Sequence, residues 1–135
     1  MHLYPITQSE KSVAENVKSK TITRLYTGAD NQSHFEELEI EMMDKGPIGF
    51  LSKNYPTKSV IFRETDGKYD YSWHNAPQKQ YIIILEGMVE ITVGNGEKRL
   101  FETGDILLAE DLTGQGHKSR CPNNRKRYSL FITID

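Results

Sequence analysis

Apolar and polar side chains alternate along most of the chain from about residue 20 onward. Alternation with a period of two is the pattern of β-strands that have one buried face and one wet face. These segments are rich in β-branched and aromatic residues and are bounded by residues that favour turns. The expected strands cover residues 21–26, 37–42, 60–64, 69–74, 81–85, 89–93, 98–100, 106–108 and 128–134. A set of about nine or ten short strands with glycine turns predicts a β-sandwich or β-barrel.

The same alternation predicts the two faces of the expected strand that ends at His74. Tyr69, Tyr71 and Trp73 share one face, which places His74 on the opposite face. The aromatic face could line an apolar pocket and stack on a planar ligand, or it could be an ordinary half-buried strand face.

Segments outside the strands carry weaker patterns. Residues 8–18 have weak helical spacing of apolar positions, so we expect a short helical or extended segment there. Residues 44–57, with two prolines and two glycines, are expected to form the longest loop. The sequence contains neither a linker nor an internal repeat, and a chain of 135 residues is long enough for one continuous core. We therefore expect one domain over residues 1–135.

Charge gives no indication of a polyanionic partner. The formal net charge is −2, which predicts no general affinity for nucleic acid or for an anionic membrane. One run of cations, Arg125-Lys126-Arg127, lies close in sequence to Lys118 and Arg120. We interpret it as a solvated turn, because three cations are too small a patch to hold a polyanion.

Cysteine usage and hydropathy indicate the compartment. Cys121 is the single cysteine, which excludes an internal disulfide and fits a reducing environment. It has no partner motif such as C-x-x-C and is interpreted as an ordinary thiol near a loop. No apolar run approaches the ~20 residues needed to cross a bilayer, and the N-terminus lacks the pattern of a signal peptide. A cytoplasmic protein is expected.

Two short segments carry the residues with the most chemistry. The first is Trp73-His74-Asn75-Ala76-Pro77-Gln78-Lys79-Gln80, which precedes a continuous apolar run over residues 81–85. The second begins at Gly104 and leads through Gly114-Gln115-Gly116 to His117. Each segment places one histidine beside a strand, and together the two could hold a metal ion or a small ligand.

These segments resemble the two motifs of the cupin superfamily, G-x5-H-x-H-x3,4-E-x6-G and G-x5-P-x-G-x2-H-x3-N. His74 matches the first histidine, and Gly87 ends the first motif at the proper spacing. The resemblance covers about residues 58–134, and residues 73–77 (WHNAP) look like a subgroup of small, functionally uncharacterised single-domain cupins. It implies an all-β fold, a double-stranded β-helix or jelly roll, with N-terminal strands at about residues 20–44.

The chain also departs from the cupin motifs. Gly67 lies seven positions before His74, one more than the first motif prescribes. Ala76 stands where the second histidine belongs, and Gln80 stands where the glutamate belongs. In the second motif, His117 falls two residues later than expected. The resemblance therefore implies the fold more directly than the activity.

A metal site on His74, Gln80 and His117 is what the resemblance implies for the ligands. Such a set has two imidazoles and one neutral amide oxygen, with water in the remaining positions, and Fe, Mn, Ni or Zn would be the ion. The alternative is a histidine hydrogen-bonded at a barrel mouth, with His117 in a glycine-rich loop. The loop before His117 could let backbone approach a ligand closely, or it could simply need positive φ.

Other residues are candidates for the same site. A further ligand or an acid/base group could come from His34, Glu64 or Gln78, whereas Tyr71 and Trp73 could line the pocket. The run Ala109-Glu110-Asp111 ends a strand in carboxylates. We interpret these as surface charge by default, although a carboxylate near the mouth could act on a substrate or orient His117.

The sequence leads to a small-molecule-binding cupin with a metal-dependent enzymatic activity, of the oxygenase or the isomerase or lyase type, as the first hypothesis. The alternative is a non-catalytic module that binds or senses a small metabolite. A third hypothesis is that the barrel serves mainly for homo-oligomerisation. The resemblance implies a homodimer formed through sheet faces or through swapped N-terminal strands, with residues 1–27 as the expected donor segment.

Overall fold

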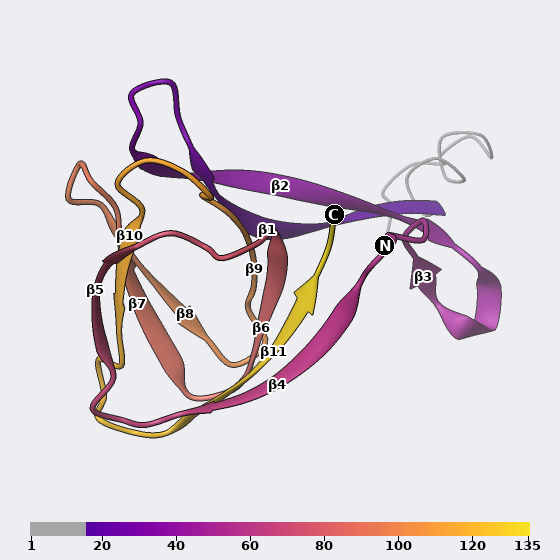
Figure 1. Cartoon of the computed structure of the whole chain (residues 1–135). Helices are drawn as coiled ribbons and strands as arrows, with labels where there is room; N and C mark the ends of the chain where they lie inside the picture. Colours follow the sequence, from indigo (N-terminus) through magenta and orange to yellow (C-terminus); the bar gives the residue numbers. More distant parts are fainter. Residues whose placement is uncertain (1–15) are drawn as a thin grey trace, which may run out of the picture. The chain divides into compact units, whose positions relative to one another are not determined.

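The computed structural model describes residues 16–135, which contain eleven strands and one short 3-10 helix. Nearly all of the regular structure is therefore β. The strands are β1 (Val17–Thr27), β2 (Ser33–Asp44), β3 (Phe50–Leu51), β4 (Ser59–Thr65), β5 (Asp70–His74), β6 (Gln80–Glu86), β7 (Met88–Thr92), β8 (Lys98–Glu102), β9 (Ile106–Glu110), β10 (His117–Arg120) and β11 (Arg127–Thr133). Figure 1 shows them coloured along the chain.

The described residues divide into two compact units. The larger unit contains residues 22–38 and 56–135, and the smaller contains residues 39–55 with the start of β1. In the smaller unit β3 pairs antiparallel with the end of β2, and a 3-10 helix, Gly46–Ile48, connects the two strands. This helix and β3 fall in the segment that the sequence predicts to be a long loop.

The larger unit is a jelly roll of two sheets. In one sheet β4, β11, β6 and β9 are neighbours in that order, followed by β1 and β2. In the other sheet the order is β5, β10, β7 and β8. From β4 onward the chain repeatedly crosses from one sheet to the other, which is the double Greek-key connectivity of a double-stranded β-helix. The predicted all-β jelly-roll fold is confirmed.

The core lies between these two sheets. Alternate residues of β7, Val89 and Ile91, are buried there because successive side chains of a strand point to opposite faces. The buried apolar cluster also includes Leu25, Ile84, Val93, Phe101 and Leu107. The period-2 pattern in the sequence therefore identifies the core face of β7 correctly.

Each of the nine predicted segments lies in an observed strand or overlaps one. The prediction of a helical or extended segment over residues 8–18 falls mostly outside the described residues, and Val17 and Lys18 at its end are in a strand, the extended alternative. The sequence pattern misses β10, which begins at His117 and is only four residues long. No helix among residues 16–135 is long and apolar enough to cross a membrane.

Trp73 and His74 lie on opposite faces of β5, as predicted. The prediction that Trp73 shares a face with Tyr71 is wrong. His74 pairs with His117 and Tyr71 pairs with Ser119, so three steps along β5 match two steps along β10. The extra residue is a β-bulge, which reverses the alternation between Tyr71 and His74. Tyr71 and His74 consequently both line the interior cavity, and Trp73 does not.

Candidate functional site

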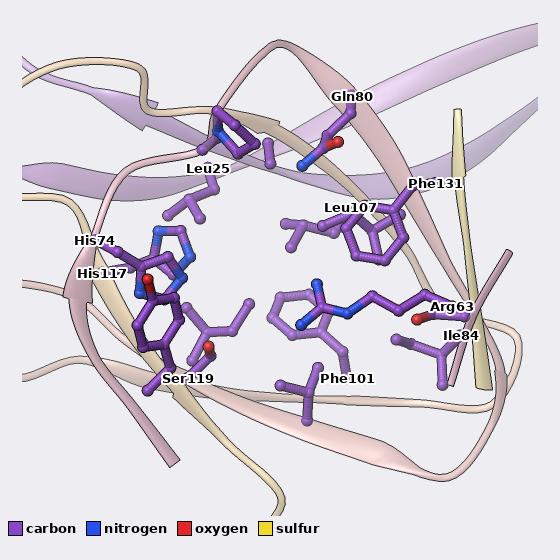
Figure 2. A pocket seen from close by; sticks show the side chains of 18 of the residues that line it. Leu25, Arg63, His74, Gln80, Ile84, Phe101, Leu107, His117, Ser119 and Phe131 are labelled. Carbon is purple, nitrogen blue, oxygen red and sulfur yellow. The ribbon is translucent and has the colours of Figure 1, made fainter. Parts of the chain in front are cut away.

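A cavity of about 410 Å³ lies inside the larger unit. Its volume is within the range of pockets that hold small molecules. Most of its wall is apolar and comes from both sheets, including Leu25, Ile84, Ile91, Phe101, Leu107 and Phe131. Figure 2 shows Leu25, Ile84, Phe101, Leu107 and Phe131 together with polar side chains of the wall. The interior of the barrel is therefore a hollow with polar groups at defined positions.

His74 and His117 form one wall of this cavity. They are opposite each other in the pairing of β5 with β10, and their ring centroids are 4.3 Å apart. Gly116 permits this approach, because a Cβ built on it would collide with the carbonyl of His74. Its φ of +78° is also a conformation that L side chains rarely adopt. The glycine therefore permits the close pairing of the two strands, and it is not among the residues that line the cavity.

A buried carboxylate holds His117. Oδ2 of Asp111 lies 2.6 Å from Nδ1 of His117 and accepts a hydrogen bond of 2.7 Å from the hydroxyl of Ser33. Asp111 has no exposed surface, and its Oδ1 has no hydrogen-bond partner in the structure. The carboxylate of Asp111 accepts a hydrogen bond from Nδ1–H of the imidazole. Nε2 of His117 is therefore the ring nitrogen that is available to a ligand in the cavity. Surface charge, the default interpretation of the Glu110-Asp111 carboxylates, is wrong for Asp111, and a carboxylate that orients His117 agrees with this geometry.

His74 has a fixed orientation as well. Its Nδ1 is 2.7 Å from the carbonyl oxygen of Ser72, which can only accept, so Nδ1 carries the proton in the neutral ring. The ring of Tyr71 stacks on it at 4.1 Å between centroids. Burial, together with the neighbouring His117, lowers the pKa of His74 below its ordinary value. A neutral His74 therefore offers the lone pair of Nε2 as an acceptor or a metal ligand.

Gln80 lines the same cavity as the two histidines. It begins β6 and is 5% exposed, and Figure 2 shows its amide directed inward. The structure thus brings His74, Gln80 and His117 to one cavity. Among residues 16–135 no three His, Cys, Asp or Glu side chains cluster as metal ligands. Two imidazoles and a neutral amide fit a transition metal only in part, since catalytic sites use about three strong protein ligands.

The other predicted pocket residues divide into two groups. Gln78 and Tyr71 line the cavity, whereas Trp73, His34 and Glu64 do not. Trp73 is 39% exposed on the face of β5 opposite the cavity. The ammonium of Lys118 lies 5.3 Å from its ring centroid.

The remaining two residues have local partners. His34 lies at the start of β2, with Nε2 at 2.9 Å from the carboxylate of Asp30 in the preceding turn. Glu64 is exposed on β4 and is paired in register with Tyr128. Local hydrogen bonding and strand alternation therefore direct both side chains away from the cavity.

Two arginines of the cavity were not predicted from the sequence. Arg63 of β4 and Arg127 of β11 both line it. The interpretation of Arg125-Lys126-Arg127 as a solvated turn is correct for the first two residues and wrong for Arg127, which is 4% exposed. Arg127 begins β11 and alternates with Ser129 and Phe131, which also line the cavity. That alternation is the signal that could have identified it.

The strand order and the interior cavity define the fold. The chain has the jelly-roll fold of cupins, with the site that the barrel encloses. No protein-family model matches the chain. It is 31% identical over 64 residues to the Oryzines biosynthesis cluster protein J of Aspergillus oryzae, which covers 47% of this chain. The match spans only 34% of that relative's length.

Solved structures with a similar fold include two described as cupins. The Cnp3 cupin domain of Schizosaccharomyces pombe has 12% identity and a TM-score of 0.44, covering 92% of this chain and 88% of that one. An RmlC-like cupin protein of Desulfovibrio desulfuricans has 13% identity and a TM-score of 0.40, covering 98% and 92%. The fold assignment itself rests on the strand order.

Proposed function

We propose that this protein is a small-molecule-binding cupin whose ligand occupies the cavity of the jelly roll. The observation that carries this proposal is the cavity of about 410 Å³, in which apolar side chains form most of the wall and a few polar groups converge. Such a combination is typical of small-molecule sites. Within the fold, we place the chain with the small single-domain cupins that share the residues 73–77.

The polar groups support recognition of a ligand. Nε2 of His74 and Nε2 of His117 both remain available, because the Nδ1 atoms are engaged by Ser72 and Asp111. Two imidazoles held at fixed positions on an apolar wall would orient a ligand while the rest of the cavity buries its apolar part. Binding therefore requires no rearrangement of these two side chains.

The test uses Ser129, which lines the cavity and whose buried hydroxyl has no hydrogen-bond partner in the structure. Ser129→Leu would fill part of the cavity, and Ser129→Ala would remove the same hydroxyl without filling it. Indole, phenol, phenylacetate and hexanoate serve as probes in thermal unfolding. We expect at least one to raise Tm in the wild type and in Ser129→Ala, and to have no effect in Ser129→Leu. Stabilisation that persists in Ser129→Leu, or the lack of it with every probe, would overturn the proposal.

A metal-dependent enzyme is the second candidate. The observation in its favour is the bond from His117 to the buried Asp111, since a carboxylate behind a histidine is common at metal sites and at general bases. His74, Gln80 and His117 would hold Fe, Mn, Ni or Zn. The partial donor set gives no basis for a reaction step through the ion.

Metal content tests this second candidate. Protein purified without chelator would be compared with a His74→Ala/His117→Ala variant by elemental analysis. A value near one equivalent that falls in the variant would support a metal centre. A value far below one equivalent, unchanged in the variant, would exclude it and leave the binding module.

We also propose a cytoplasmic homodimer. Support for the dimer comes from Phe62, which is 81% exposed on β4, and from Val60 and Ile61, which are also exposed. Within residues 16–135, β4 ends its sheet, and an exposed apolar edge strand favours pairing with another chain. Light scattering should give twice the monomer mass, and Phe62→Lys should reduce it. A monomeric wild type would exclude the dimer.

A further inference from the structure

Arg127 is a buried cation without an acidic partner in residues 16–135. The residue is 4% exposed, and it forms no ion pair with a carboxylate of this part of the chain. Its polar contacts are long: one guanidinium nitrogen is 3.5 Å from the carbonyl of Met88 and 3.6 Å from the sulfur of Cys121. Buried charges in proteins are normally paired, so this arrangement calls for a counter-ion.

A second arginine reaches the same part of the cavity. Arg63 comes from β4, and Figure 2 shows its guanidinium extending toward the centre of the cavity. It also forms no ion pair among the described residues. Its guanidinium carbon lies 5.2 Å from the ring centroid of Phe131, an apolar neighbour that does not neutralise its charge.

Tyr69 lies beside both guanidinium groups. Its ring centroid is 5.2 Å from the guanidinium carbon of Arg127 and 5.6 Å from that of Arg63. The hydroxyl of Tyr69 is 2.7 Å from the hydroxyl of Ser119, which fixes the ring in the cavity wall. The two cations are thus held around one ordered aromatic side chain.

Asp105 in the cavity wall and Asp111 behind His117 do not neutralise these cations. Asp105 also lines the cavity, but one of its oxygens accepts the backbone N–H of Glu102, and it is not ion-paired to either arginine. Asp111 is engaged by His117 and Ser33. The side of the cavity around Tyr69 is therefore cationic.

We propose that the ligand is a small organic acid, whose carboxylate lies beside Tyr69 in the field of Arg63 and Arg127. This inference rests on the proposed function and specifies its ligand class. The apolar wall around the arginines, which includes Ile84 and Phe131, favours one anionic head with an apolar body over a multiply charged ion. Guanidinium groups suit a carboxylate because their N–H donors match its two oxygens.

The experiment compares acids with amides of the same shape. Phenylacetate is paired with phenylacetamide, and hexanoate with hexanamide, in titration calorimetry on the full chain at one ionic strength. We expect the acid of at least one pair to bind tenfold or more tightly than its amide. Arg127→Met and Arg63→Met should each remove most of that preference. Arg125→Met removes the same charge from an exposed residue outside the cavity wall and should leave the preference unchanged.

The outcomes separate this inference from the proposed function. Equal binding of acid and amide, or a preference that survives both Arg127→Met and Arg63→Met, would overturn the organic-acid inference while cavity binding stands. Failure of all four compounds to bind would count against both proposals. If Arg127→Met does not fold, Arg63→Met still tests the inference. Arg127→Lys then serves as the second variant, which keeps the charge and should weaken acid binding less than Arg63→Met.

Discussion

Asp111 and His117 are joined by a contact of 2.6 Å between Oδ2 and Nδ1 in the wall of the jelly roll. The carboxylate has no exposed surface, and its oxygen also receives the hydroxyl of Ser33. One buried group therefore fixes a cavity histidine and a residue at the start of β2. Removing it would leave both partners without an acceptor.

Asp111→Ala is expected to lower the free energy of unfolding by about 2–4 kcal/mol, because two buried donors lose their acceptor. Asp70→Ala is the matched control, since Asp70 is exposed at the start of β5, and a change within about 0.5 kcal/mol is expected for it. Urea denaturation measures both. Equal effects of the two variants would show that the Asp111 bond contributes little.

Gly116 should tolerate a side chain less well than Gly96. Both have positive φ, +78° and +91°, so alanine strains the backbone at either position. Only at Gly116 would the new Cβ meet another backbone segment, that of His74, whereas nothing lies within 4 Å of the position at Gly96. We expect Gly116→Ala to cost about 1–3 kcal/mol more than Gly96→Ala in denaturation. Similar costs would mean that β5 and β10 can separate freely.

Protonation of His74 is expected to reduce stability in acid. Its pKa in the folded protein lies below the ordinary value of 6.5, mainly because of burial. The unfolded chain therefore binds a proton more readily, so stability falls as the pH decreases from about 6.5 through the folded-state pKa and is retained above 6.5. This group contributes at most about 1.4 kcal/mol per pH unit.

The corresponding measurement is the free energy of unfolding of the wild type and of His74→Gln, determined in urea on both sides of the ordinary histidine pKa. The variant should lose less stability on acidification, because it lacks the group that takes up the proton. Parallel pH profiles for the two proteins would contradict the assignment.

Arg127→Met is expected to leave the ligand-free protein as stable as the wild type or to raise its Tm. A buried unpaired cation is costly, and an apolar residue of similar length removes that cost. A purely structural arginine, holding Met88 and Tyr69, would give the opposite result. Thermal unfolding without ligand distinguishes the two roles, and a marked decrease in Tm would favour the structural one.

Hydrophobic alternation was sufficient to predict nine of the eleven strands, because a strand with one buried face alternates apolar and polar residues. It could not predict β10, since His117–Arg120 is short, polar and follows a glycine loop. The sequence pattern could not predict the bulge in β5 either. It depends on the register against β10, which is a property of two strands distant in the sequence.

For the candidate site, the motif comparison selected His74, Gln80 and His117, and all three line the cavity. It could not select Arg127, because a run of three cations resembles a surface turn unless the start of β11 is known. The same limitation applies to Arg63, which lies in a strand that is exposed along most of its length. Charge patterning in sequence does not show which cations lack partners.

The bulge in β5 also bears on how this barrel can diversify. One additional residue between Tyr71 and His74 decides which side chain of the pair Trp73 and His74 enters the cavity. A deletion of Ser72 or Trp73 would remove the bulge and leave Tyr71 and His74 two positions apart, so both would still face the cavity. The bulge thus accommodates one residue of additional strand length without changing which side chains form the wall.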